Sequence, residues 1–518
     1  MQPLDPDELR TSLERITSER VEVRETHVSV VLLTRDRAFK LKKPVVLPFL
    51  DYGTPARRRA MCTEEVRLNQ RLAPGIYLGV RGVVRGDVGL ELRDDDDPDA
   101  IDYVVAMRRY DERHTLAAML ARGELTRGQM IAVGELLADF HARCTPADGS
   151  HGGARIVELE VMRNVAQLLE VAELHSERER IHSLARFMTA FLGARADVFD
   201  GRAAQGLIRE VHGDLRAEHV VIEGERISVV DCVEFDRELR TLDVADDLAF
   251  LVMDLTALGG EHVASQLLDA YRAAGGQCGD AALVAFFAAH RALVRAKVLL
   301  VRAGQYPQRS SAHGRAGAQA RELLTLAERY AWRARLPLAI VVCGVPASGK
   351  STLAAAVAEA ARVPRISSDL LRKRLAGIRP TTRASAERYS EQFNRATYAE
   401  LGHRAAALAA AQGGVVIDAT FRRRADRDAF AAAFDGAAPL VFVECEAPVD
   451  VLRERAMRRE RDPTRVSDAT VEVVIRERSS WEPLDEVPPG DHLCIRTDRP
   501  IDRISAELIA LLDLRLAR

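Results

Sequence analysis

The stretch LAIVVCGVPASGKSTLAAAVAEAA, Leu338 to Ala361, decides the fold of the second part of the chain. An apolar run leads into Gly-x-x-x-x-Gly-Lys-Ser, and an alanine-rich run follows directly. This order of strand, glycine-rich turn and helix is typical of a phosphate-binding P-loop. Backbone N–H groups of such a turn surround phosphate oxygens, and the positive end of the helix points at them. The sequence therefore predicts a site for a nucleoside triphosphate.

Within this loop the nucleotide-binding residues are predicted to be Gly344, Val345, Pro346, Ala347, Ser348, Gly349, Lys350, Ser351 and Thr352. Lys350 is expected to reach the β- and γ-phosphates, and the Ser351 hydroxyl to hold Mg²⁺. Asp418 ends the apolar run VVID and is the second candidate ligand of the metal, acting through water. An acidic residue often ends a strand without binding a metal, so a structural role for Asp418 stays open.

Two further segments supply candidate catalytic groups. In RISSDLLRKRL, Asp369 stands at the start of a helix and is a candidate base for a substrate hydroxyl, although helix capping is an equal alternative. In VLRERAMRRERDPTRVSD, residues 451–468, Arg455 and Arg458 are candidates to close over the transferring phosphate as a lid. A solvated basic helix face is the alternative for most of these arginines.

The rest of this part alternates between strand-like and helix-like segments, which predicts a parallel sheet covered by helices. From about Leu338 to Leu484 the pieces GVPASGKST, SSDLLRKRL, VVIDATFRRRADRDAF and RERAMRRERDPTRVSD resemble small P-loop kinases of the gluconate kinase, zeta toxin and polynucleotide 5′-kinase group. The resemblance implies that Asp369 is the base and that the arginine segment is the lid.

The first part of the chain carries a different constellation in VHGDLRAEHVVIEGERISVVDCVEF, Val211 to Phe235. An Asp on a tight loop, here Asp214, can accept the proton of a substrate hydroxyl. A second Asp after a short hairpin, here Asp231, can hold Mg²⁺ against the phosphates. We expect Gly224 in the turn of that hairpin.

Upstream segments complete the pattern in the expected order. RAFK is predicted as a strand that presents Lys40 to the phosphates, with Lys42 on the same face as its rival. A helix around CTEEVRLN offers Glu65, or less favourably Glu64, as the ion-pair partner of the lysine. YVVAMRRYDE is expected to meet adenine near Met107.

These residues resemble the aminoglycoside phosphotransferase-like branch of the protein-kinase fold, over roughly Val28 to Leu255. Two departures stand out. No glycine-rich loop precedes RAFK, so the phosphates would meet Ser29 or plain backbone. His219 occupies the position, five after the Asp, where this branch has an Asn that holds a metal ion. Imidazole is a poorer Mg²⁺ ligand than an oxygen, so His219 either ligates the ion, bonds Asp214 or substrate, or marks a dispensable second metal. An active domain is favoured over a pseudokinase.

With 518 residues, the chain is too long for one core. We predict an α+β protein-kinase-like domain over residues 1–310, a helical linker over 311–336 and an α/β P-loop kinase domain with a parallel sheet over 337–518. In this order the two halves resemble bacterial proteins described as bifunctional aminoglycoside phosphotransferase-like and P-loop ATP-binding proteins. That resemblance implies ATP and Mg²⁺ as cofactors and a small-molecule hydroxyl acceptor, for example a sugar or amino-sugar.

Composition narrows the remaining alternatives. The net charge of −3 gives no global attraction to nucleic acid or to an anionic membrane. Seven scattered cysteines without a Cys-x-x-Cys pair argue against a disulfide framework and a zinc site, and no secretory signal or membrane span is visible, so a cytoplasmic protein is expected. The alternative function is a regulatory nucleotide-binding protein with a silent first domain and a zeta-toxin-like second domain. The oligomeric state stays open.

Overall fold

The computed structural model describes residues 4–26, 28–47, 50–148, 151–307, 310–379, 381–382, 390–461 and 469–517. The chain divides into two compact units, and each is described by itself. The first unit comprises residues 1–157 and 196–292, and the second comprises 158–195 and 293–518. The division falls inside two helices, so the domain limits expected from the sequence stay a prediction.

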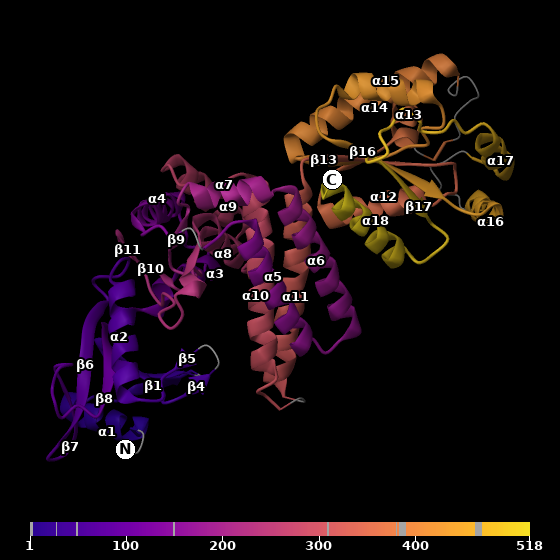
Figure 1. The fold of residues 1–518 in the computed structure, drawn as a ribbon. Helices are drawn as coiled ribbons and strands as arrows, with labels where there is room; N and C mark the ends of the chain where they lie inside the picture. Colours follow the sequence, from indigo (N-terminus) through magenta and orange to yellow (C-terminus); the bar gives the residue numbers. More distant parts are fainter. Residues whose placement is uncertain are drawn as a thin grey trace. The chain divides into compact units, whose positions relative to one another are not determined.

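A six-stranded antiparallel sheet forms one end of the first unit (Figure 1). Its strands in spatial order are β1 (Glu22–Glu25), β2 (Ser29–Leu33), β3 (Arg37–Lys42), β8 (Asp102–Arg108), β6 (Tyr77–Gly86) and β7 (Gly89–Arg93). Helix α2 (Pro55–Asn69) packs on β8 and β6, and α1 (Pro6–Thr17) packs on β7. Thr54 caps α2 and Pro55 starts it, as expected for a helix N-terminus.

The remainder of the first unit is helical and carries three short strand pairs. The pairs are β4 (Val46–Leu47) with β5 (Leu50–Asp51), β9 (Ile208–Glu210) with β12 (Thr241–Asp243), and β10 (Val220–Glu223) with β11 (Arg226–Val229). The helices are α3 (Leu116–Ala121), α4 (Arg127–Arg143), α7 (Ala196–Ala204), α8 (Val244–Ala257), α9 (Glu261–Ala273) and the first part of α10 (Ala281–Ala303), with 3₁₀ turns η1 (Glu112–His114) and η2 (Glu238–Arg240). Gly224 lies in the β10–β11 turn with φ 63°, as expected. An antiparallel sheet on which α2 and α1 pack, followed by a helical part, is the α+β protein-kinase-like fold.

The second unit contains a five-stranded parallel sheet with the order β14-β15-β13-β16-β17. The strands are β13 (Leu338–Cys343), β14 (Arg365–Ser367), β15 (Gly414–Asp418), β16 (Leu440–Glu446) and β17 (His492–Arg496). All six side chains of β13 are buried, because this central strand is covered on both faces. β13, the first of these five strands along the chain, thus lies third in the sheet, which is the α/β P-loop kinase arrangement.

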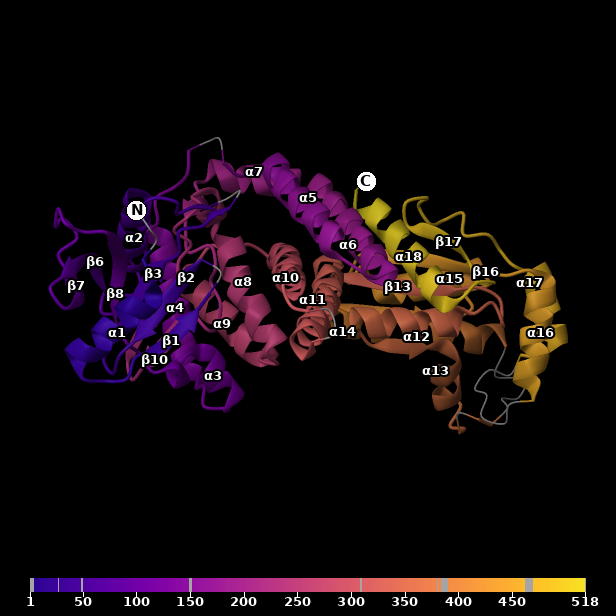
Figure 2. The ribbon, with the colours of Figure 1, turned by 90° about the horizontal axis from the view of Figure 1, so that it is seen from below.

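Helices cover both faces of this sheet (Figures 1 and 2). The described helices of the unit are α5 (Ala154–Val171), whose first residues belong to the first unit, α6 (His175–Ala194), the last part of α10, α11 (Ser311–Arg335), α12 (Lys350–Ala361), α13 (Ser368–Leu375), α14 (Glu391–Gln412), α15 (Arg424–Phe434), α16 (Val449–Glu460), α17 (Val471–Ser479) and α18 (Ile501–Leu516). One apolar core lies between the sheet and α12 with α18, and a second lies between the sheet and α14 with α15.

Helix α11 begins at Ser311, the residue at which the helical linker was expected to begin. The glycine- and serine-rich segment from Arg302 to Gln319 shows no clear apolar period, yet its second half is helical from Ser311 onward. The Ser310 side chain accepts a hydrogen bond from the His313 amide and caps the helix. Ala316 and Ala320, one turn apart, are buried, so small residues supply the packed face that larger ones usually signal.

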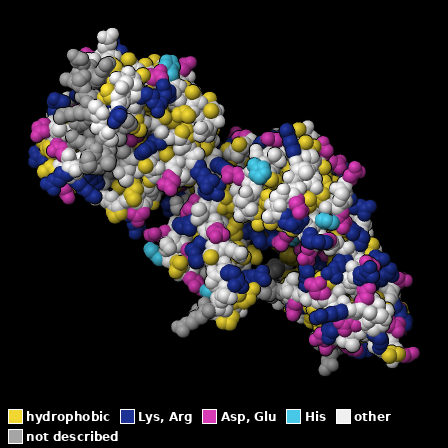
Figure 3. All heavy atoms as spheres, turned by 180° about the vertical axis from the view of Figure 1, so that it is seen from behind, with side chains coloured by type: hydrophobic (Ala, Val, Ile, Leu, Met, Phe, Trp, Pro, Cys, Tyr) yellow, Lys and Arg dark blue, Asp and Glu magenta, His cyan; other side chains and the backbone are white. Residues whose placement is uncertain are grey.

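Acidic and basic side chains are interspersed on the face of the molecule shown in Figure 3. Among the described residues, none of the helices has the length and apolarity needed to cross a membrane.

Candidate active sites

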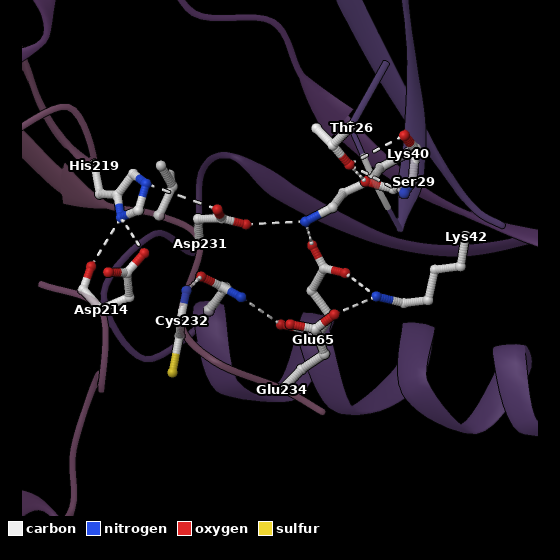
Figure 4. A network of polar contacts seen from close by, with 12 residues as sticks. Thr26, Ser29, Lys40, Lys42, Glu65, Asp214, His219, Asp231, Cys232 and Glu234 are labelled. Atoms are coloured by element: carbon white, nitrogen blue, oxygen red, sulfur yellow. Dashed lines mark hydrogen bonds and ion pairs between the residues drawn. The ribbon is translucent and has the colours of Figure 1, made fainter. Parts of the chain in front are cut away.

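In the first unit, Lys40, Glu65 and Asp231 lie together (Figure 4). Nζ of Lys40 lies 2.8 Å from Oε1 of Glu65 and 2.9 Å from Oδ1 of Asp231. β3 supplies Lys40, α2 supplies Glu65, and the loop after the β10–β11 hairpin supplies Asp231. Glu64, the less favoured partner, instead binds Arg67 and Arg240. The structure therefore brings together the lysine, glutamate and aspartate that the sequence selected.

Asp231 is held in a strained position beside this lysine. Its φ is 64°, a left-handed conformation that residues other than glycine seldom adopt. Its backbone N–H donates to the Tyr77 hydroxyl at 3.2 Å. The charge of Lys40 holds the pKa of Asp231 well below its usual range, although partial desolvation acts in the opposite direction, and the Asp231 side chain is 48% exposed. Asp231 thus presents a charged carboxylate to incoming ligands.

Lys42, the rival of Lys40, has a different set of partners. Its Nζ lies 2.7 Å from Oε2 of Glu65, also bonds Glu234, and lies 3.3 Å from the Tyr52 hydroxyl. The Lys42 side chain is only 1% exposed. Glu65 therefore binds one lysine with each oxygen (Figure 4). Lys40 faces the site, whereas Lys42 is a buried cation that fixes Glu65 from behind.

The loop that carries Asp214 is fixed by a buried carboxylate of α8. Asp247 accepts hydrogen bonds from the backbone N–H groups of Gly213 at 2.8 Å and His212 at 3.2 Å, and lies 3.1 Å from Nε2 of His141. Burial opposes its ionisation, but these donors hold the pKa of Asp247 at about 2. Gly213 has φ 82°, and a Cβ there would lie 2.7 Å from the Leu239 carbonyl oxygen. Only glycine fits this turn.

Arg216 binds Asp214 through two parallel hydrogen bonds. Its Nε lies 2.9 Å from Oδ1 and its Nη2 lies 3.0 Å from Oδ2. Burial favours the protonated acid, but Arg216 and His219 outweigh it and hold the pKa of Asp214 below its usual value. A carboxylate in this state can accept a proton only when a substrate displaces part of the guanidinium.

His219 lies between the two aspartates (Figure 4). Its Nδ1 lies 2.8 Å from the backbone oxygen of Asp214, and a carbonyl can only accept, so Nδ1 carries the proton. In the neutral ring Nε2 is then an acceptor, and Nη2 of Arg216 lies 3.0 Å from it. Nε2 also lies 3.7 Å from Oδ2 of Asp231.

These contacts decide how well Mg²⁺ fits the first site. The exposed carboxylate of Asp231 is a hard oxygen ligand and fits the ion. His219 does not fit in this arrangement, because Arg216 uses the Nε2 lone pair that would bind a metal. Of the alternatives for His219, bonding to Asp214 is the one that the geometry shows, through the Asp214 backbone.

Other predicted residues of the first unit take the following places. Met107 lies on β8 beside Tyr110 at the edge of an apolar cluster around Cys62 and Val105. Ser29 is 2% exposed, and its hydroxyl lies 2.9 Å from that of Thr26. In addition to these residues, two acids are paired at the start of α8: its N-cap Asp243 pairs with Arg202, and Asp246 pairs with Arg291.

In the second unit the P-loop lies between β13 and α12 as the sequence predicts. Gly344 has φ 138°, and a Cβ there would lie 2.6 Å from the Cys445 carbonyl oxygen, so only glycine fits. Lys350 begins α12 and is 8% exposed. The Ser351 hydroxyl lies 3.2 Å from Oδ1 of Asp418. A hydroxyl and a carboxylate side by side are hard oxygen ligands, so this pair fits Mg²⁺.

Acidic groups gather around this pair. Burial raises the pKa of Asp418, although Lys350 acts in the opposite direction, and the charge of Asp369 raises it further. Asp369 stands in the first turn of α13, whose N-cap Ser367 makes no side-chain capping bond. Glu477 of α17, which the sequence reasoning missed, has a buried Oε2 without a hydrogen-bond partner among the described residues, and burial raises its pKa.

The lid candidates Arg455 and Arg458 line a cavity of about 460 Å³ beside the P-loop. Arg455 donates to the Thr497 carbonyl at 2.6 Å, and its Nη1 lies 3.5 Å from the Ala347 carbonyl oxygen. The cavity is also lined by Gly349, Thr352, Leu353, Arg459, Thr497, Arg499, Ile501 and Ile504. The remainder of the arginine segment, 462–468, lies outside the described residues.

Several residues of the sites were not singled out from the sequence. Arg216 resembles any charged loop residue, and only its position two residues after Asp214 hints at a contact. Glu234, Tyr52 and Asp247 act across long sequence separations, so no local spacing marks them.

A family model described as an AAA domain matches residues 340–484. Two proteins, "Uncharacterized protein Rv2004c" of Mycobacterium tuberculosis strain H37Rv and "Uncharacterized protein Mb2027c" of Mycobacterium bovis, are each 35% identical over 467 residues, which cover 88% of this chain and 88% of theirs.

Two solved structures resemble single parts of the chain. A gluconokinase from Sinorhizobium meliloti 1021 is 28% identical with a TM-score of 0.27, covering 35% of this chain and 95% of its own. A putative aminoglycoside phosphotransferase from Ralstonia eutropha JMP134 is 16% identical with a TM-score of 0.37, covering 64% of this chain and 98% of its own. At these TM-scores the fold assignment rests on strand order and site geometry instead. The chain belongs to the same family as these mycobacterial proteins, and in it an aminoglycoside phosphotransferase-like part is followed by a P-loop kinase-like part.

Proposed function

We propose that the chain is a tandem ATP-dependent phosphotransferase whose two sites each move a γ-phosphoryl group to a hydroxyl of a small molecule. The observations that carry this proposal are the joint placement of Lys40, Glu65, Asp231 and Asp214 within the first unit and, separately, a complete P-loop within the second unit. The acceptor is a sugar, an amino-sugar or a related alcohol.

In the first site Lys40 exchanges its contact with Asp231 for the nucleotide phosphates, while Glu65 keeps the ammonium in place. Asp214 accepts the proton of the acceptor hydroxyl as its oxygen attacks the γ-phosphorus. The bond between that phosphorus and the bridging oxygen to the β-phosphate breaks, and ADP leaves with the electron pair. Mg²⁺, held by Asp231, would neutralise the charge of the phosphates.

In the second site the P-loop amides and Lys350 bind the phosphates, and Ser351 with Asp418 would hold Mg²⁺. Asp369 accepts the proton of the hydroxyl on the acceptor molecule. The half-buried Glu477 is a second acidic group near Lys350. Arg455 and Arg458 lie where they can neutralise charge that develops on the transferring group.

A second candidate function is favoured by one observation. Arg216 occupies both oxygens of Asp214, which is the arrangement expected if the first unit binds nucleotide without turnover. The chain would then be a regulatory nucleotide-binding protein with a single active, zeta-toxin-like site.

The experiment that separates them measures transfer of label from γ-³²P-ATP to a panel of sugars and amino-sugars by the full chain. Tandem transfer predicts that Asp214→Asn abolishes one product and Lys350→Ala abolishes another. If Asp214→Asn changes no product while Lys350→Ala abolishes one, the second candidate holds. If neither variant changes any product, both candidates are wrong.

A further inference from the structure

Three side chains of different chemistry meet on one face of the second unit's sheet, outside the site described above. Glu444 lies on β16, and His492 and Cys494 lie two residues apart on β17, at the sheet edge (Figure 1). Glu444 is the cross-strand partner of Cys494. Because side chains alternate between the faces of a strand, all three point to the same side. One ligand atom of each lies within 4.8 Å of the others.

The distances suit a tetrahedral metal ion. Sγ of Cys494 lies 3.6 Å from Nε2 of His492. A Zn²⁺ ion bound to sulfur at about 2.3 Å and to nitrogen at about 2.0 Å separates these two atoms by about 3.5 Å. Nε2 of His492 lies 2.8 Å from Oε2 of Glu444, against about 3.3 Å in such a complex. When these two atoms move apart by about half an ångström, each can bind the metal ion in place of their hydrogen bond.

We propose that Glu444, His492 and Cys494 bind one Zn²⁺ ion, with a fourth position open to water or another ligand. Thiolate, imidazole and carboxylate together form a donor set that zinc accepts and Mg²⁺ does not prefer. The site is thus distinct in chemistry from the oxygen pair of Ser351 and Asp418, and it does not depend on the proposed kinase function. A ligand set assembled across two strands leaves no Cys-x-x-Cys spacing, which is why the cysteine pattern of the sequence argued against a zinc site.

The surroundings support ion access and charge balance. The side chains of Glu444 and His492 are 15% and 23% exposed, and Cys494 is exposed while the six other cysteines are buried. Partial burial and the charges of Glu444 and Glu446 raise the pKa of the Cys494 thiol. Binding therefore releases the thiol proton to solvent, and affinity increases as the pH rises.

Metal binding at this edge would also stiffen a strand that leads to the P-loop. Three residues after Cys494, the Thr497 hydroxyl donates to the carbonyl of Ser348, and its amide donates to Glu446 at 2.9 Å. An ion that joins β16 and β17 restricts this connection without adding a ligand to the nucleotide site.

The test is a titration of the full chain, stripped of metal by a chelator, with Co²⁺ and then Zn²⁺. The proposal predicts one Co²⁺ per chain with a thiolate-to-Co²⁺ absorption band, and displacement of that ion by Zn²⁺. Cys494→Ser abolishes the band, and His492→Gln weakens Zn²⁺ binding by more than the roughly 10- to 100-fold lost when a ligand's hydrogen-bond partner is removed. Melting curves recorded in chelator verify that both variants fold.

His175→Gln is the matched control, because His175 and Glu179 form an exposed histidine–carboxylate pair at 3.3 Å that lacks a thiol. This variant is expected to bind Co²⁺ as the wild type does. The proposal is overturned if the wild type gives no thiolate band, or if either folded variant, Cys494→Ser or His492→Gln, binds Zn²⁺ with wild-type affinity.

Discussion

Nε2 of His219 lies 3.0 Å from Nη2 of Arg216, and the same guanidinium binds both carboxylate oxygens of Asp214. A fixed positive charge therefore stands beside the position where this branch of kinases carries a metal-binding Asn. Arg216 and His219 form one hydrogen-bonded unit, and the properties of the loop depend on both.

The number of metal ions bound per chain tests the pairing of Arg216 with His219. His219→Asn alone is expected to leave the number of bound Mn²⁺ ions per chain unchanged in the presence of ADP, because Arg216 still fills the space. Combined with Arg216→Ala, the same change provides an oxygen ligand and an open position, so the number rises by one. Electron paramagnetic resonance counts free Mn²⁺. An extra ion in the single His219→Asn variant would show that Arg216 does not block the position.

Stability separates the two lysines of β3. Lys42→Met leaves the buried Glu234 without its ion-pair partner and removes one of the two cations of Glu65, so the free energy of unfolding is expected to fall by about 3–5 kcal/mol. Lys43, whose partner Glu25 is exposed, is the control, and Lys43→Met should cost about 0.5 kcal/mol or less. Urea unfolding measures both values. Equal losses would contradict the role assigned to Lys42.

Acid sensitivity follows from His212. Burial lowers the pKa of this 1% exposed imidazole to about 4, against 6.5 for an unburied histidine. Below pH 6.5 the unfolded chain takes up a proton that the folded chain refuses, so stability falls as the pH drops from 6.5 to 4. The loss from this group is about 3 kcal/mol across that window, at about 1.4 kcal/mol per pH unit.

Urea unfolding at pH 7 and pH 5 measures this slope. A shallower slope is expected for His212→Asn and an unchanged slope for the exposed His175→Gln. Identical slopes in the wild type and His212→Asn would exclude His212 as the source.

The role of Asp369 can be separated from helix capping by kinetics. As a base, Asp369→Asn lowers kcat of the P-loop reaction by about 10²- to 10⁴-fold and leaves nucleotide affinity unchanged. As a cap, the same change leaves kcat intact and costs about 1 kcal/mol of stability or less. The two roles are distinguished by unfolding curves and by the rate of forming the product that Lys350→Ala abolishes.

Local patterns in the sequence were sufficient to predict the P-loop, the β10–β11 hairpin and the pairing of Lys40 with Glu65. Each depends on spacing within one element or on the order of elements that the kinase resemblance implies. The strand order of the parallel sheet could not be read in this way, because long-range pairing decides it. The first turns of α11 show no clear apolar period because their buried positions, Ala316 and Ala320, are alanines, which carry little apolar signal.

The parts of the sites that escaped prediction share one physical property. Arg216, Glu234 and Glu477 are charged residues in segments that sequence alone indicates as solvated. Arg216 bonds its neighbours Asp214 and His219, Glu234 meets the distant Lys42, and Glu477 lies near Lys350, and only the folded structure shows these contacts.

The most direct test of the central claim is the number of nucleotide sites per chain. Titration of the full chain with a non-hydrolysable ATP analogue and Mg²⁺ is predicted to give two sites. Asp231→Ala and Lys350→Ala are each predicted to leave one site, and the double variant none. A wild-type chain with a single site, removed by Lys350→Ala and untouched by Asp231→Ala, would contradict the account of the first unit as a working nucleotide site.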